Sequence, residues 1–180
     1  MMFAMSILQL IKRNLNGKSG ASAETETVRK IANALDQLDP ARAKFIAAFA
    51  YLLGRAARAD MHISLEETGL MERIIMEHGG MPEGQAILVV QMAKTQNILF
   101  GGTENFLVSR EFNSNSTHQE RMALLDCLFA VAAADSSIAT IEDNEISQIA
   151  DELRIEHRDF IAIRSKYRDR LAVLKNSGSH

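Results

Sequence analysis

Apolar residues recur every three or four positions along most of the chain, which is the period of an α-helix with one buried face. The strongest run spans residues 41–59. One side of this run carries only small residues, and small side chains let a neighbouring helix approach closely. We therefore expect 41–59 to be the central helix of a bundle. Its apolar stripe comprises Phe45, Phe49, Leu52, Leu53 and Ala56, and its small face comprises Ala47, Ala50, Gly54 and Ala57.

The same period predicts further helices on both sides of this one. They span about 25–38, 64–78, 82–96, 103–112, 117–134, 141–153 and 156–174. Asp39-Pro40, Gly79-Gly80 and Gly101-Gly102 mark breaks between them. No stretch shows the sustained alternation of a strand, so we expect an all-α, single-domain bundle of about seven to nine helices.

Residues 1–15 also carry apolar residues at helical spacing, with Lys12 and Arg13 near the end of the run. We expect this helix to dock on the body of the protein, and contact with a partner or a membrane surface are the alternatives. The predicted organisation is an N-terminal amphipathic helix and linker over 1–23, a helical domain over 24–175 and a tail over 176–180.

Two stretches repeat the order of helix, short acidic loop and helix. The first loop begins at Asp60 and the second at Asp135, and five pairs of residues correspond at a constant offset. These pairs are Asp60 with Asp135, Ile63 with Ile138, Glu67 with Glu142, Met71 with Ile146, and Ile74 with Ile149. We therefore expect two pseudo-repeated halves.

The composition narrows the functional classes. Across 180 residues the net charge is −3, with two Tyr and no Trp, so neither a basic field nor stacking aromatics support nucleic-acid binding. The single Cys127 excludes a disulfide framework and a thiolate cluster, and we expect it to be a buried core residue. No run reaches transmembrane length and no signal peptide is recognisable, which predicts a cytoplasmic, bacterial-type protein.

Motifs that carry catalysis are absent from the sequence. The histidines are scattered without a paired spacing, and the Gly-Gly pairs are turn signals that lack a phosphate-loop pattern. A basic run near the end of the chain includes Arg164 and Arg170, with Tyr167 between them, and we interpret it first as a solvated helix end. The chain is therefore expected not to be an enzyme.

The two repeated stretches resemble the tellurite-resistance TerB family and the related N-terminal part of the DnaJ-like DjlA proteins. The closer copy is Ala132-Ala133-Ala134-Asp135-Ser136-Ser137-Ile138 with Glu142, and the resemblance covers about 41–165. The family has Gly after each Asp, where this chain has Met61 and Ser136. The resemblance implies a two-halved helical bundle without established catalytic activity, linked to tellurite resistance and stress and often near membranes. It also implies that acidic residues bind a divalent metal, here Asp60, Glu67, Asp135 and Glu142.

The chemistry of the acidic loops allows two interpretations. Four carboxylates brought together would repel one another without a cation, and hard oxygen ligands suit Ca²⁺, Mg²⁺ or Mn²⁺. Alternatively, the carboxylates cap helices, since acidic residues are favoured in a first helical turn. Further metal ligands could come from Glu66, His62, Asp143 and Glu145. Capping-box spacing is found for Ser64 with Glu67, Thr140 with Asp143, and Thr117 with Glu120.

Two functions follow from these patterns. The first is a non-enzymatic, TerB-like stress-response protein that binds a divalent metal between its two halves. The second is a helical interaction module or scaffold without metal, whose acidic residues are helix caps. In both cases we expect an unidentified protein partner, at the inner face of the membrane or in the cytoplasm, and self-association remains open.

Overall fold

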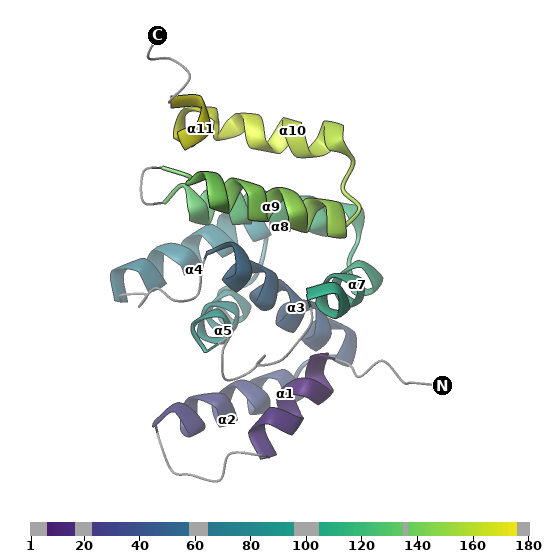
Figure 1. Cartoon of the computed structure of the whole chain (residues 1–180). Helices are drawn as coiled ribbons and strands as arrows, with labels where there is room; N and C mark the ends of the chain where they lie inside the picture. The colour runs from purple at the N-terminus through teal and green to yellow at the C-terminus, as the bar shows by residue number, and fades with distance from the viewer. Residues whose placement is uncertain (1–6, 17–22, 58–64, 96–104, 135–136, 176–180) are drawn as a thin grey trace.

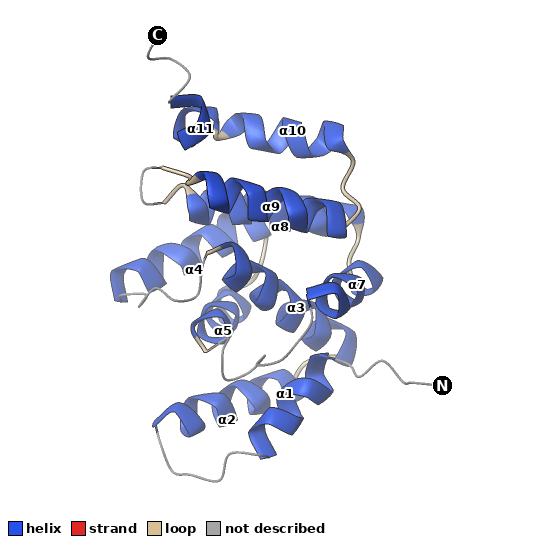
Figure 2. Ribbon diagram, in the orientation of Figure 1, coloured by secondary structure: helices blue, strands red, loops and turns tan. Residues whose placement is uncertain are grey.

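The computed structural model describes residues 7–16, 23–57, 65–95, 105–134 and 137–175 (Figure 1). The regular structure of these residues is helical, apart from one isolated bridge between Ile138 and Leu171 (Figure 2). The all-α prediction is confirmed. The helices are α1 (Ile7–Asn16), α2 (Ala23–Asp36), α3 (Pro40–Ala56), α4 (Leu65–Gly79), α5 (Glu83–Lys94), α7 (Asn105–Asn115), α8 (His118–Ala132), α9 (Thr140–Glu152), α10 (His157–Lys166), the 3₁₀ turn η1 (Arg168–Arg170) and α11 (Ala172–Lys175).

Helix α3 lies at the centre of the bundle, as its apolar and small faces predicted. Asp39 caps it by accepting hydrogen bonds from the backbone N–H groups of Ala41 and Arg42, and Pro40 occupies the first turn. Every residue from 45 to 54 is buried. Helices α5 and α7 make the most extensive contacts with α3, and α1, α8 and α9 also contact it (Figure 1).

The helices of the two predicted halves pack across each other. Helix α4, from the first half, lies along α8 of the second half, and α9 contacts α3 (Figure 1). Helix α8 begins with the predicted capping box, in which Thr117 and Glu120 each accept a backbone N–H of the other. The pseudo-repeat of the two halves stays a prediction from the sequence.

Glycine ends α4 where the sequence predicted a stop. Gly80 has φ +63°, a conformation that side chains with a Cβ rarely adopt. The chain then turns into α5, which packs against both α3 and α4. The end of α4 also lies next to α8, where His78 contacts Asp126.

The last predicted helix, 156–174, is wrong as a continuous element. It is broken at Tyr167 into α10, η1 and α11. The break lets the segment after η1 pair with the strand-like residue before α9. In this pairing, Ile138 N–H donates to the Arg170 carbonyl at 2.8 Å and Ala172 N–H donates to the Ile138 carbonyl at 3.0 Å. A continuous helix could not place Leu171 in this bridge.

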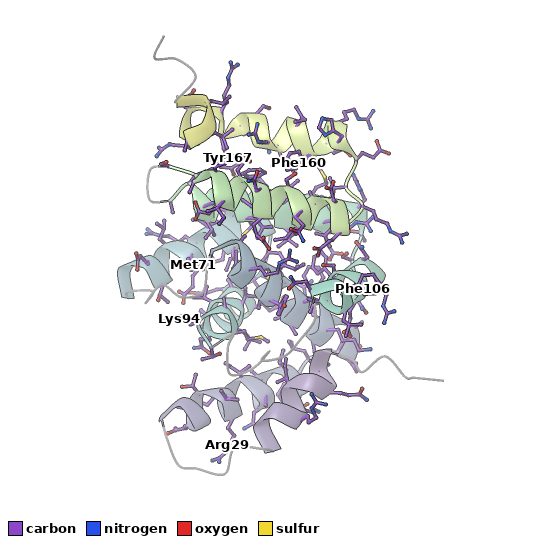
Figure 3. The ribbon with its side chains drawn as sticks, in the orientation of Figure 1. Arg29, Met71, Lys94, Phe106, Phe160 and Tyr167 are labelled. Atoms are coloured by element: carbon purple, nitrogen blue, oxygen red, sulfur yellow. The ribbon has the colours of Figure 1, made fainter. Side chains whose placement is uncertain are left out.

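The two ends of the described chain cover opposite sides of α3 and α8. Helices α1 and α2 form a layer at one end, and α10 and α11 form a layer at the other (Figure 1). Ile11 of α1 is buried, so the N-terminal helix docks on the body, which was the first of the predicted alternatives. At the opposite end, Phe160 and Tyr167 of the α10 segment meet Phe129 of α8 at ring-centroid distances of 5.9 and 5.6 Å (Figure 3).

Candidate functional site

The predicted acidic residues divide into described and undescribed positions. Asp60, His62 and Asp135 lie outside the described residues, as do Met61, Ser136 and the side chain of Glu66. Glu67 is an exposed residue in the first turn of α4, and Glu142 lies in the first turn of α9. The structure therefore places two of the four principal candidates, and the predicted metal site as a whole stays a prediction.

Glu142 has a capping role. Its Oε2 accepts the backbone N–H of Ala139 at 2.8 Å, directly before α9 begins. This is one half of a capping box, because Ala139 has no side-chain acceptor for the return bond. The predicted box between Thr140 and Asp143 is wrong, since the N-cap is Ala139 and Asp143 has another partner.

Asp143 forms a bidentate ion pair with Arg164 and so joins α9 to α10. Arg164 Nε and Nη2 donate to the two carboxylate oxygens at 2.8 and 2.6 Å. The hydrogen bonds that Arg164 donates to Asp143 raise the pKa of Arg164. The Asp143 side chain is only 10% exposed and that of Arg164 23% exposed, so the interpretation of Arg164 as part of a solvated helix end is wrong.

Glu145 belongs to a cluster around Arg55 of α3. Arg55 Nε lies 2.6 Å from Glu145 Oε1, and Arg55 Nη1 lies 2.8 Å from Glu152 Oε2. Ser109 of α7 donates its hydroxyl hydrogen to Glu152, so the cluster joins three helices. Burial raises the pKa of Glu152, but hydrogen bonds from Arg55 and Ser109 outweigh this effect and leave the pKa below its ordinary value.

A second polar cluster surrounds Asp126 of α8. Its carboxylate accepts His78 Nδ1–H at 2.8 Å and the Tyr167 hydroxyl at 3.1 Å, and it lies 3.3 Å from Lys166 Nζ. Burial raises the pKa of Asp126, but the hydrogen bond from His78 and the charge of Lys166 outweigh it, so the pKa is lowered. The cluster ties α4 and the α10 segment to α8.

The neighbouring Cys127 is fully buried, as predicted for a core residue. Burial and the nearby Asp126 carboxylate raise the pKa of its thiol far above the ordinary value. A thiol in this environment stays protonated near neutral pH, and the protonated form is a poor nucleophile and metal ligand.

The described carboxylates do not fit a metal site. Within the described ranges, no group of three or more His, Cys, Asp or Glu side chains is arranged to hold an ion. Asp143 and Glu145, two of the additional candidates, are each paired with an arginine. A metal site in this chain would therefore depend on Asp60 and Asp135 with Glu67 and Glu142, and on the undescribed candidates His62 and Glu66.

Sequence reasoning missed the residues that organise these clusters. Arg55 lies directly before Ala56, the last residue of the apolar stripe, and gave no signal, because its partners are 90 and 97 positions away. Asp126 is the one charged residue of the apolar run 122–134, which was the available sign of a buried polar contact. Ser109 had no distinguishing pattern around it.

Fold and clusters together define an all-α domain whose buried charged residues join its helices. The chain belongs to the TerB family, because the family described as tellurite resistance protein TerB matches residues 45–165. This match runs from within α3 to within α10 and confirms the resemblance drawn from the repeated loops. No curated protein and no solved structure matches the chain.

Crossing a lipid bilayer requires a helix that is both long and strongly apolar. None of the described helices combines the necessary length with sufficient hydropathy.

Proposed function

We propose that this TerB-family protein acts in the response to tellurite and related stress by binding a protein partner, without catalysing a reaction. The observation that carries the proposal is that acidic side chains of the domain are paired with arginines of neighbouring helices. Asp143, Glu145 and Glu152 hold helices together through arginines. This supports the interaction module over the metal-binding protein. We place the partner in the cytoplasm or at the inner face of the membrane.

The environment of Cys127 supports a non-catalytic role. Reduction of tellurite requires an electron donor, and a thiolate is the reactive form of cysteine. Cys127 is the one cysteine of the sequence, and burial keeps its thiol protonated. The protein therefore contributes no thiolate to such a reaction while it is folded.

Replacement of Cys127 by Ala tests this point. In cells that lack the gene, we expect wild type and Cys127→Ala to restore the same tellurite tolerance, measured as survival against tellurite concentration. The variant should lose about 1 kcal/mol of stability, because a small core side chain is shortened.

The melting temperature and cellular level of the variant are the controls. If Cys127→Ala were folded and equally abundant but failed to restore tolerance, thiol chemistry would be part of the function and the proposal would be wrong. Equal tolerance would leave binding as the role of the domain.

A divalent metal is the second candidate ligand, supported by the position of Glu67 and Glu142 in corresponding first turns of α4 and α9. The four-carboxylate prediction requires Asp60 and Asp135 to complete this set. Ca²⁺, Mg²⁺ and Mn²⁺ are the ions that such oxygen ligands prefer.

Melting curves of chelator-stripped protein distinguish the two candidates. A bound ion stabilises the folded state by mass action, by about 2.7 kcal/mol at one hundred times its dissociation constant. The interaction module predicts no saturable rise in melting temperature with millimolar Ca²⁺, Mg²⁺ or Mn²⁺. A rise that Asp60→Asn with Asp135→Asn abolishes, and that the exposed control Glu156→Gln retains, would establish the metal site instead.

A further inference from the structure

A hollow of about 470 Å³ opens between α7, the start of α8 and the joint from α9 to α10. Its size lies within the usual range of small-molecule sites. Figure 1 shows α7 beside this joint, at the end of α9. Three arginines from three different segments line the hollow, namely Arg110, Arg121 and Arg154. We call it the arginine cleft.

The positive charge of the arginine cleft is not neutralised by ion pairs. Within the described part of the chain, none of the three arginines lies in a salt bridge. Two carboxylates also line the cleft. The charge of Glu152 is neutralised by Arg55, which lies outside the cleft. The three positive charges of the cleft therefore face one remaining negative charge, that of Asp151. The lining therefore favours an anion.

Arg121 has too few hydrogen-bond acceptors for its place in the fold. Its Nε is buried and has no partner among the described residues. Its Nη1 reaches Asn113 Oδ1 at the long distance of 3.4 Å. An anion in the hollow cannot reach the buried Nε, but Arg121 lines the hollow and its guanidinium is paired with no carboxylate among the described residues, so its terminal nitrogens can donate to a ligand. An anion in the arginine cleft would supply oxygens to this group.

Arg154 occupies a backbone position that favours glycine. Its φ is +55°, and it follows the last turn of α9. The Arg154 N–H donates to the Asp151 carbonyl and the Ile155 N–H to the Ala150 carbonyl, both at 3.0 Å. This is the helix ending in which Gly is normally found, because a Cβ is disfavoured there. Arg154 therefore adopts a strained backbone conformation at a position where its side chain lines the arginine cleft.

We propose that the arginine cleft binds the phosphate group of a small phosphorylated molecule. Guanidinium groups pair with phosphate through two parallel hydrogen bonds, and three of them around one hollow suit a dianion. Phe106 of α7 (Figure 3) also lines the cleft and is 65% exposed. The Arg110 guanidinium carbon lies 5.6 Å from the centre of the Phe106 ring. This ring offers a face to an aromatic part of the ligand. This proposal is independent of the protein partner proposed above.

Titration calorimetry at constant ionic strength tests the proposal, with inorganic phosphate and AMP as the probes. Wild type should bind both saturably, and AMP more tightly than inorganic phosphate. Arg154→Gly and Arg110→Gln should each weaken phosphate binding at least tenfold. Arg154→Gly is informative because it relieves backbone strain, so its melting temperature should equal or exceed that of wild type.

Arg158→Gln is the matched control, because Arg158 is a nearby exposed arginine outside the arginine cleft. It removes the same charge and should bind phosphate as wild type does. The proposal is overturned if wild type binds neither probe at millimolar concentration, if Arg154→Gly and Arg110→Gln bind as tightly as wild type, or if Arg158→Gln weakens binding as much as they do. Phe106→Ala should remove the advantage of AMP, and an unchanged advantage would contradict the role of the ring.

Discussion

Arg55 neutralises two carboxylates from a position that is almost closed to solvent. Its side chain is 7% exposed, whereas those of Glu145 and Glu152 are 33% and 21% exposed. A guanidinium has five donors in a fixed plane, so it can bind two carboxylates at once where lysine could not do so in the same geometry. Removal of this one residue would leave two partly buried negative charges facing each other.

We predict that Arg55→Met lowers the free energy of unfolding by about 2–4 kcal/mol, somewhat less than the loss for a fully buried pair, because the two glutamates are partly exposed. Urea denaturation measures the effect. The triple variant Arg55→Met with Glu145→Gln and Glu152→Gln should recover part of the loss. A triple variant less stable than the single one would show that the cluster is not held by charge.

At the scale of elements, α10 is attached to the bundle by a charged and an aromatic contact. The ion pair between Asp143 and Arg164 fixes it to α9. On α8, the Phe129 ring packs against Phe160 and stacks on Tyr167 at an interplanar angle of 17°. Because the segment after η1 also pairs with Ile138, this terminal layer has its own set of contacts. It can therefore loosen without unfolding α3.

Asp143→Asn should loosen α10 selectively. The variant keeps the shape of the side chain but loses the charge that Arg164 requires, at a cost of about 1.5–3 kcal/mol. Hydrogen–deuterium exchange should quicken at the backbone amides of α10, with little change in α3. Asp169→Asn, at an exposed position of η1, is the control and should change neither. Equal acceleration in α3 and α10 would mean that the two unfold as one unit.

At the scale of the whole molecule, two carboxylates join helices that are far apart in the sequence. Asp126 connects α8 to α4 and the α10 segment, and Glu152 connects α9 to α3 and α7. Both have pKa values below their ordinary values of 3.8 and 4.5. The unfolded chain therefore binds more protons than the folded one in the acid range, and acid favours unfolding.

We predict that stability is retained above pH 4.5, the ordinary value for Glu152, and is lost as the pH falls through the lowered pKa values. Chemical denaturation at a series of pH values measures this dependence. Glu152→Gln should be less stable at neutral pH and should show a shallower decline in acid. An acid limb as steep as that of wild type would assign the decline to other groups.

The sequence allowed the helices to be predicted better than the contacts between them. Periodicity along α3 and α8 is a local property, so their burial could be predicted without the fold. The end of α10 was missed because Leu171 leaves the helical period to pair with Ile138, which lies in a distant segment. The cluster of Arg55 was missed for the same reason, and the loop residues Asp60 and Asp135 remain untested.

The complete burial of residues 45–54 affects how the protein is made. The ribosome adds about 5–20 residues per second, and 97 positions separate Arg55 from Glu152, so about five to twenty seconds pass before the partners of α3 are all synthesised. During the last part of that interval the surface of α3 that α8 and α9 later cover is still exposed. Chaperones that bind apolar segments of nascent chains can bind this surface. The rate of translation therefore sets how long the surface stays exposed before the protein folds.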